Sequence, residues 1–312
     1  MTFSTHGVVL ESPNPFWLLS GTMHRLSRLY DFLMFSSVFL SLAGMAMVYI
    51  SCVLQGIPLS LPALLIMFLT PFSIYNLNKK TDEDEDAVNR RDRYAFTKRY
   101  EKSLSALAWV SYAAAFLIAA FFGIPSLLVV SIPLVSGILY SMRWLPASFP
   151  YRRLKEIPVV KNALVAFAWA SIAALLPVCL AHGIPDVRTF ITFAFLFSPV
   201  FIGSIIPDIR DKEGDALAGI RTIPVIIGAK HTSRLLSAMN FLIGLVVFLG
   251  CIHTIPPVFT VIVAAGFVYM HCCIHIFMKH RENPLVCDLL VDGQFIFFSI
   301  GILGLASLRF LP

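Results

Sequence analysis

The chain has 312 residues, of which 58% are hydrophobic and only 13% are charged, and its formal net charge at pH 7 is +6. Soluble domains carry about 25% charged residues, so a mean hydropathy of +0.81 excludes an ordinary water-soluble globular protein. The apolar residues cluster in runs of about 20, which is the length of a helix that crosses a bilayer. We therefore predict an all-α integral membrane protein.

Nine membrane-spanning helices are predicted in chain order, at residues 30–54, 59–77, 103–122, 124–142, 162–182, 188–206, 234–254, 256–278 and 290–310. The uncharged joints at Gly123 and at Pro256–Pro257 are typical of tight helical hairpins. We expect a single membrane-embedded domain over residues 1–312. Residues 1–22 have no basic start, continuous apolar core or small-residue cleavage site, so we interpret them as a cytoplasmic leader rather than a signal peptide.

The basic residues are distributed unevenly between the two sides of this topology. With nine spans, only Arg188 and Arg309 of the 24 Lys and Arg residues lie on the side opposite the N-terminus. The positive-inside rule assigns the basic side to the cytoplasm. Topology and attraction to anionic membrane lipid account for the positive charge, so we expect no nucleic-acid partner.

The loop after the second span holds a first acidic motif. Asn78, Asp82 and Asp86 are spaced by four residues, so a helix that continues past the membrane would place them on one stripe, about 6 Å apart per step. A hard divalent cation prefers oxygen ligands of this kind. Because residues 82–86 are also an unbroken run of carboxylates, a solvated acidic loop is the alternative interpretation.

A second acidic motif follows the sixth span. Asp208, Asp211 and Asp215 stand at i, i+3 and i+7, which is one face of a helix that leaves the bilayer. Gly219 is predicted to end that helix, and Thr222 to begin a new element. Two such stripes at one membrane face indicate a shared site.

Carboxylates this close repel one another, so the stripes cost stability unless a cation compensates them. Mg²⁺ prefers one or two carboxylates together with waters and substrate phosphate oxygens. Two facing stripes therefore predict Mg²⁺ as a cofactor that bridges to a diphosphate. Basic side chains near both motifs would bind the same anion: Lys79, Lys80, Arg90, Arg91, Arg93, Arg210, Lys212 and Arg221.

These motifs resemble those of the UbiA superfamily of integral-membrane prenyltransferases. The family's first motif, Asn-Asp-x-x-Asp-x-x-x-Asp, is matched at Asn78, Asp82 and Asp86, with Lys79 in place of the second residue. Its second motif, Asp-x-x-x-Asp-x-x-x-Gly-x-x-Thr, is matched at Asp211, Asp215, Gly219 and Thr222. The segment from Tyr140 to Asn162 looks like the family's middle cytoplasmic loop.

The resemblance implies a UbiA-type bundle of nine transmembrane helices whose central cavity opens to the cytoplasmic side. It also implies Mg²⁺-dependent transfer of a polyprenyl group from an isoprenyl diphosphate donor to a lipophilic or aromatic acceptor, with release of pyrophosphate, in quinone or archaeal-type ether lipid biosynthesis. The expected metal ligands are Asn78, Asp82, Asp86, Asp208, Asp211 and Asp215. The expected catalytic residues among these are Asp82, Asp86, Asp211 and Asp215. The expected substrate-binding residues are Asn78, Arg90, Arg93, Tyr140, Lys155, Asn162 and Arg221.

The chemistry of such a transfer explains these residue types. Ionisation of an allylic diphosphate builds negative charge on the leaving oxygens, where Mg²⁺ and basic side chains stabilise it. The carbocation needs an apolar pocket whose aromatic faces stabilise it and exclude water. The 27 Phe and 9 Tyr of the chain supply such faces.

Weaker signals have simpler interpretations. His271 and His275 stand one turn apart in the eighth span, and we favour helix packing over a metal or haem site because no third ligand is near. Asp288 and Asp292 begin the ninth span, and we favour capping of that helix over a part in the polar site. The six cysteines form no CxxC pair, so neither a zinc site nor a disulfide framework is indicated.

Three other functions compete with prenyl transfer. A secondary transporter would carry charged residues near the membrane midplane, whereas the predicted mid-span regions lack them. A CDP-alcohol phosphotransferase would carry the sequence Asp-Gly-x-x-Ala-Arg, which is absent. A non-catalytic member of the same fold is the third, because Lys79 departs from the motif. Lys79 and the segment Arg153-Leu-Lys155 look more like archaeal or bacterial members, but the acceptor and the donor chain length stay open.

Overall fold

In a computed structural model, the protein is described at residues 21–81, 83, 87, 90–217, 220–281, 283 and 285–307. Asp82 and Asp86 of the first motif and Gly219 of the second therefore lie outside the described residues. The helices are α1 (Gly21–Phe35), α2 (Val38–Gln55), α3 (Leu61–Thr81), α5 (Arg91–Arg99), α6 (Glu101–Ala120), α7 (Ile124–Ser141), η2 (Leu154–Glu156), α8 (Val160–Leu180), α9 (Val187–Arg210), α10 (Lys212–Leu217), α11 (Ile223–Ile227), α12 (Ala229–Thr254), α13 (Pro257–Lys279), the π-helix η3 (Val286–Val291) and α14 (Gln294–Ser307). Within these ranges the fold is all-α, as predicted.

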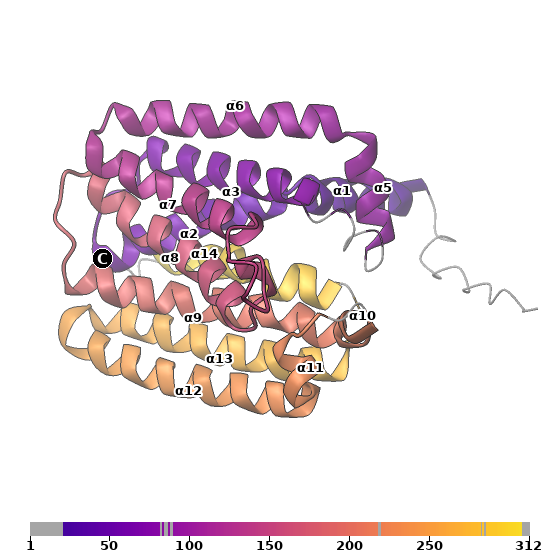
Figure 1. The fold of residues 1–312 in the computed structure, drawn as a ribbon. Coiled ribbons are helices and arrows are strands. Elements are labelled where there is room, and N and C mark those ends of the chain that lie inside the picture. Colours follow the sequence, from indigo (N-terminus) through magenta and orange to yellow (C-terminus); the bar gives the residue numbers. More distant parts are fainter. Residues whose placement is uncertain are drawn as a thin grey trace, which may run out of the picture.

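The long helices lie side by side in a bundle (Figure 1). Among the described residues, eight helices are long and apolar enough to cross a membrane: α2, α3, α6, α7, α8, α9, α12 and α13. The ninth predicted span, 290–310, corresponds to the shorter apolar helix α14. The predicted count of nine is therefore not confirmed by length, although α14 packs against α2.

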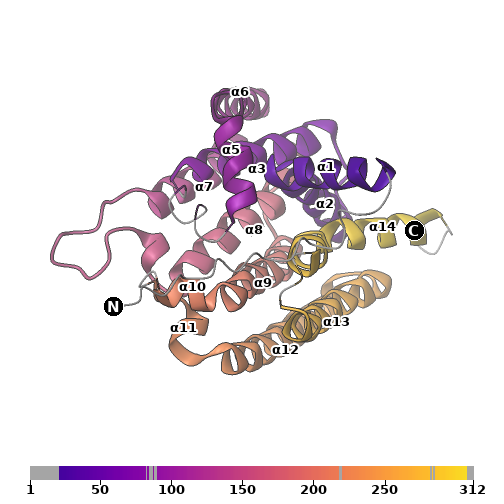
Figure 2. The ribbon, with the colours of Figure 1, turned by 90° about the vertical axis from the view of Figure 1, so that its right-hand side faces the viewer.

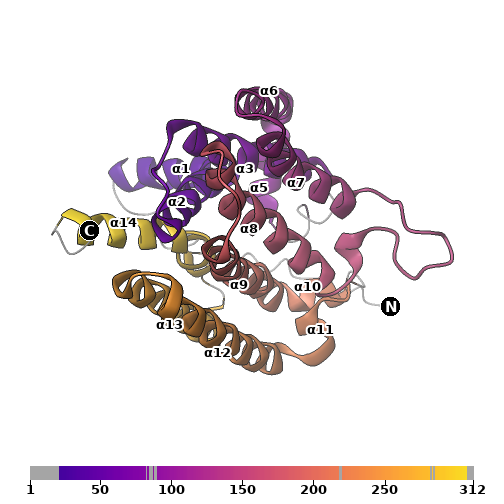
Figure 3. The same ribbon diagram turned by 90° about the vertical axis from the view of Figure 1, so that its left-hand side faces the viewer.

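The central and peripheral helices differ in burial. In α8 and α9, 67% of the apolar stretch that could cross the membrane is buried inside the protein, against 28% in α6, α7 and α12. Figures 2 and 3 show α6 at one edge of the bundle and the α12–α13 pair at the opposite edge. Because the peripheral helices are apolar, their exposed faces are suited to lipid. In the centre, a Cβ on Gly44 of α2 would lie 2.5 Å from the backbone oxygen of Met67, so only glycine permits α2 and α3 to pack this closely.

The first predicted span, 30–54, is wrong as a continuous helix. The structure divides it into α1 and α2, and Ser37 at the break has a φ of +67°. Side chains from α3 satisfy the polar groups that the break leaves unpaired. The Lys79 ammonium donates to the Phe35 carbonyl oxygen and, at 2.8 Å, to the Ser37 hydroxyl, and it is joined at 3.1 Å to the side-chain oxygen of Asn76. Lys79, the residue that differs from the family's first motif, thus stabilises the break between α1 and α2.

The predicted hairpin joints are confirmed. Gly123, with a φ of +95°, separates α6 from α7, and Pro256 precedes α13 directly after α12. Hairpins return the chain to the same end of the bundle, where the short elements α1, α5, α10 and α11 gather at the right-hand side of Figure 1. The end of α3, which carries Asn78, and the α9–α10 segment, which carries the second motif, therefore lie at one end of the molecule.

Candidate active site

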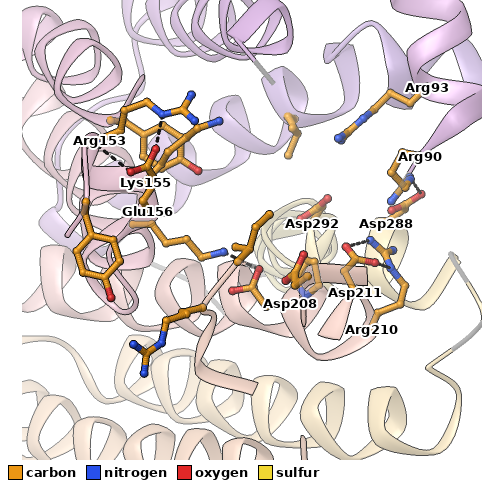
Figure 4. Close-up of a pocket in the computed structure, with 18 of the residues that line it drawn as sticks. Arg90, Arg93, Arg153, Lys155, Glu156, Asp208, Arg210, Asp211, Asp288 and Asp292 are labelled. Atoms are coloured by element: carbon orange, nitrogen blue, oxygen red, sulfur yellow. Dashed lines mark hydrogen bonds and ion pairs between the residues drawn. The ribbon is translucent and has the colours of Figure 1, made fainter. Parts of the chain in front are cut away.

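A polar cavity of about 670 Å³ opens at this end of the bundle. Figure 4 shows carboxylates in its centre, with basic residues on both sides of them. Its charged and phenolic lining residues come from six connections or helix ends: Arg90, Arg93, Tyr140, Tyr151, Arg153, Lys155, Glu156, Lys161, Asp208, Arg210, Asp211, Asp215, Arg221, Asp288 and Asp292.

The three carboxylates of the second motif meet in this cavity, as their spacing predicts. Asp208 lies in the last turn of α9, Asp211 lies at the joint, and Asp215 lies in α10. The Asp211 N–H donates to the Pro207 carbonyl at 3.0 Å, and the Asp215 N–H donates to the Asp211 carbonyl at 2.8 Å. The helical path is thus nearly continuous through the joint, which keeps all three side chains on the cavity side. Thr222 begins α11, as predicted.

Two of these carboxylates have a basic partner. The Lys161 ammonium donates to Asp208 Oδ1 at 2.8 Å, and the Arg210 guanidinium donates to both oxygens of Asp211, at 2.8 and 2.9 Å. The other oxygen of Asp208 is buried and has no hydrogen-bond partner among the described residues. An orphaned carboxylate oxygen in a polar cavity marks a position suited to a cation or a polar ligand.

Burial raises the pKa of Asp215 to about 6. The neighbouring Asp208 and Asp211 add to this rise, while Lys161 acts in the opposite direction. A bound cation would relieve this repulsion. Over the described ranges, no three His, Cys, Asp or Glu side chains are arranged to hold a metal ion by themselves. Mg²⁺ needs only one or two carboxylates beside water and phosphate oxygens, so these residues fit that ion.

Basic residues form two walls of the cavity. Arg90 and Arg93 approach from the start of α5, and Lys155 and Arg153 from η2 on the other side (Figure 4). The Arg153 guanidinium is held by Glu156 at 2.7 Å, and Lys155 is buried. Two facing cationic walls above a floor of carboxylates suit a polyanion that shares a cation with that floor.

Five of the predicted substrate-binding residues line this cavity, namely Arg90, Arg93, Tyr140, Lys155 and Arg221. Two do not. Asn78 lines an adjoining apolar cavity instead. Asn162 is buried between α8 and α9, where its amide donates to the Ser204 carbonyl at 3.0 Å and to its hydroxyl at 3.1 Å. Its contacts are those of a residue that joins two helices.

Asp288 and Asp292 belong to the polar site, which the interpretation as helix caps alone had disfavoured. Both line the cavity, and Asp288 also stands in the first turn of the π-helix η3, where a capping acid was expected. The Tyr30 hydroxyl donates to Asp288 at 2.6 Å, and Arg90 lies 3.5 Å from the same carboxylate. Burial and then Asp288 raise the pKa of Asp292 to about 7, opposed by Arg90. The only sequence signal for this role is that Asp288 and Asp292 are two acidic residues, four positions apart, on the side of the membrane that carries the basic loops.

Two smaller cavities adjoin the polar one. A cavity of about 200 Å³ between α3, α7 and α8 shares Arg93 and Tyr140 with it. A cavity of about 140 Å³ between α2, α8, α9 and α14 shares Leu40, Pro207 and Asp292 with it. Tyr75 and Trp169 line both smaller cavities, and the Trp169 indole N–H donates to the Tyr75 hydroxyl at 3.0 Å. This hydrogen-bonded pair stands between the two.

The histidine pair of the eighth span lies apart from the site. The rings of His271 and His275 are 4.5 Å apart on an exposed face of α13. Neither ring lines the three cavities described above. The pair therefore has no geometric link to the carboxylates.

A helical membrane bundle whose polar cavity is lined by carboxylates and basic side chains, with apolar cavities beside it, is typical of a class, the membrane-embedded transferases that act on lipid-like diphosphates. The chain belongs to the UbiA prenyltransferase family, whose family model matches residues 37–287.

Individual relatives agree with this assignment. The chain is 27% identical over 173 residues to the digeranylgeranylglyceryl phosphate synthase of Thermococcus kodakarensis, a match that covers 54% of this chain and 57% of that protein. A UbiA homologue from Aeropyrum pernix K1, solved in the apo form, has a TM-score of 0.65 at 17% identity, covering 84% of this chain and 96% of that one. A UbiA homologue from Archaeoglobus fulgidus, solved with GPP and Mg²⁺, has a TM-score of 0.62 at 17% identity, covering 88% and 99%. The two structures show the shared fold.

Proposed function

We propose that the protein transfers a polyprenyl group from an isoprenyl diphosphate to a lipophilic or aromatic acceptor, with Mg²⁺ as cofactor and pyrophosphate as product. One observation carries the proposal: carboxylates of α9–α10 and basic residues of three other connections line one cavity, which adjoins an apolar cavity. The family membership supports it. The excess of Lys and Arg at this end of the bundle favours the cytoplasmic face.

Mg²⁺ would be held by Asp208, Asp211 and Asp215 together with the first motif, Asn78, Asp82 and Asp86. When bound, the ion neutralises charge on the diphosphate oxygens as the carbon–oxygen bond breaks. The A. fulgidus homologue solved with GPP and Mg²⁺ supports the choice of ion. Arg210, which pairs with Asp211 in the described structure, would be released to the diphosphate when a cation takes its place.

The basic walls would bind the diphosphate. Arg90 and Arg93 on one side, and Lys155 with Arg221 on the other, surround the carboxylates. Guanidinium groups bind phosphate oxygens in pairs, and in a cavity that limits water they stabilise the charge that grows on the leaving group. The buried position of Lys155 strengthens its interaction with an anion for the same reason.

The prenyl chain would occupy the 200 Å³ cavity. Its walls are mainly apolar, and two of its polar residues, Arg93 and Tyr140, also line the polar cavity. Tyr140 lies at that junction, where its ring would face the carbon that loses the diphosphate. An aromatic face stabilises a neighbouring cation and displaces water that would capture it.

For the acceptor, the name of the T. kodakarensis relative favours a glyceryl phosphate lipid over an aromatic ring. Transport is disfavoured, because charged residues of the eight described spans lie only near their ends.

The test is a transfer assay on protein in lipid nanodiscs, supplied with geranylgeranyl diphosphate, Mg²⁺ and a panel of glyceryl phosphate and aromatic acceptors. Pyrophosphate release and product mass are measured. We expect Asp211→Asn to lower the rate about 100-fold, as loss of one group that stabilises developing charge does. The matched control is Glu213→Gln, an exposed acid of α10 that does not line the cavity, and it should retain the wild-type rate.

Near-normal Mg²⁺-dependent transfer by both Asp211→Asn and Asp208→Asn would refute the assigned site. If wild-type protein forms no product with any acceptor but moves ions into liposomes, the proposed function itself is wrong.

A further inference from the structure

The two smaller cavities border the polar cavity at places whose lining residues carry charges of opposite sign. The cationic Arg93 lines both the polar cavity and the 200 Å³ cavity, and Lys79 also lines the latter. The 140 Å³ cavity has Asp292 at its junction, and no Lys or Arg among its lining residues in the described chain. The two mouths therefore select different ligands.

Charge assigns the ligands. An isoprenyl diphosphate carries its negative head next to its chain, so its chain enters the cavity whose mouth is cationic. The carboxylate of Asp292 repels a diphosphate but accepts a hydrogen bond from a hydroxyl. The 140 Å³ cavity is thus suited to an apolar body whose reacting group is a hydroxyl.

The position of Asp292 also suits proton transfer. It lies in the turn between η3 and α14, on the border of both cavities, and Figure 4 shows it among the labelled carboxylates of the site. Asp288 is held by Tyr30 and Arg90, whereas no hydrogen bond or ion pair joins the Asp292 side chain to a described residue. Arg90, Arg93 and Arg210 lie close enough to act on its charge, but its oxygens can still accept a hydrogen bond from a substrate.

A partition separates the two ligands. Tyr75 and Trp169 line both smaller cavities and are joined by a hydrogen bond of 3.0 Å. With this pair between the cavities, ligands that occupy them would meet at the border of the polar cavity. The diphosphate end of the donor would lie there beside Asp292.

We propose that the 140 Å³ cavity receives a hydroxyl-bearing lipophilic acceptor and that Asp292 is the base that takes the hydroxyl proton during prenyl transfer. The inference rests on the proposed function. In the step, the acceptor oxygen forms a bond to the first carbon of the prenyl group. The bond from that carbon to the diphosphate oxygen breaks, the proton of the acceptor passes to the Asp292 carboxylate, and pyrophosphate leaves with the bonding electron pair.

The experiment compares Asp292→Asn and Asp292→Glu with wild type, in nanodiscs with the acceptor that the panel identifies. Binding of geranylgeranyl diphosphate with Mg²⁺ is measured by calorimetry, and transfer by product mass. We expect Asp292→Asn to keep donor affinity within about threefold and to lose about 100-fold in transfer rate, the usual contribution of a general base. Asp292→Glu should recover most of that rate.

A second variant tests the cavity itself. Ala43 is buried and lines the 140 Å³ cavity only, so Ala43→Leu should raise KM for the acceptor about tenfold and leave KM for the donor unchanged.

Three results would overturn the inference while leaving the proposed function intact: wild-type transfer by Asp292→Asn, loss of donor binding in step with transfer, or an acceptor that is alkylated only on ring carbon. Absence of transfer by the wild-type protein would refute the proposed function and this inference together.

Discussion

Replacement of Lys161 by methionine should destabilise the protein, and Mg²⁺ should reverse most of the effect. The Lys161 ammonium lies 2.8 Å from Asp208, and their side chains are only 18% and 13% exposed. Without the ammonium, folding must either bury the Asp208 carboxylate unpaired or protonate it, and both cost free energy; its second oxygen has no described partner.

The magnitude lies between two limits. Breaking a fully buried ion pair costs about 3–5 kcal/mol, and an exposed pair contributes about 0–1 kcal/mol. A pair that is more than four-fifths buried should cost about 2–3 kcal/mol, which corresponds to a fall of about 5 °C in the midpoint of thermal unfolding. Bound Mg²⁺ supplies the missing positive charge, so the loss should shrink to less than about 1 kcal/mol.

The assay is thermal unfolding in detergent, first with a chelator and then with saturating Mg²⁺ and pyrophosphate. The matched control is Lys98→Met, which removes an exposed ion pair with Glu83 at 3.0 Å and should change stability by less than about 1 kcal/mol in both conditions. Equal losses for the two variants, or a Lys161→Met loss that ignores Mg²⁺, would refute the reasoning about charge at Asp208.

Two further substitutions test neighbouring features. A Cβ on Gly137 would have its nearest neighbours at 3.8 Å, on Ile74, so Gly137→Leu should fit and fill part of the 200 Å³ cavity. It should change the ratio of the two kcat/KM values about tenfold in favour of geranyl over geranylgeranyl diphosphate. An unchanged ratio in a competition assay would show that the prenyl chain binds elsewhere. Tyr30→Phe removes the 2.6 Å hydrogen bond to Asp288 and should lower stability by about 2 kcal/mol, as for a bond to a charged group. Identical unfolding midpoints for this variant and wild type would show that the hydroxyl adds nothing.

Local signals made much of the fold predictable. Hydropathy located the spans because a helix in lipid must satisfy its own backbone groups, and Gly123 and Pro256 placed the hairpin joints. The second motif was predictable for a similar reason, since Asp208, Asp211 and Asp215 are brought together by one nearly continuous helical path. Such features depend on residues that are close in the sequence.

The errors come from contacts between distant residues. Nothing local marks a break at Ser37, because it contains neither Pro nor Gly and hydropathy continues across it. The break exists because Lys79, 42 residues later, donates to its hydroxyl. Likewise Asp288 is drawn into the site by Tyr30, 258 residues away, and by a π-helix that the pattern of apolar residues does not announce. A single sequence offers no means of seeing either pairing.

The hydrogen bonds from Lys79 to Phe35 and Ser37 have a consequence for the order in which the protein is assembled. During synthesis α1 leaves the ribosome before α3, so the ammonium that fixes the break between α1 and α2 does not yet exist when α1 appears. We therefore expect α1 to reach its final position only after the α2–α3 hairpin has been inserted. Once α1 is in that position, the helix that leads into the first motif is already in the membrane.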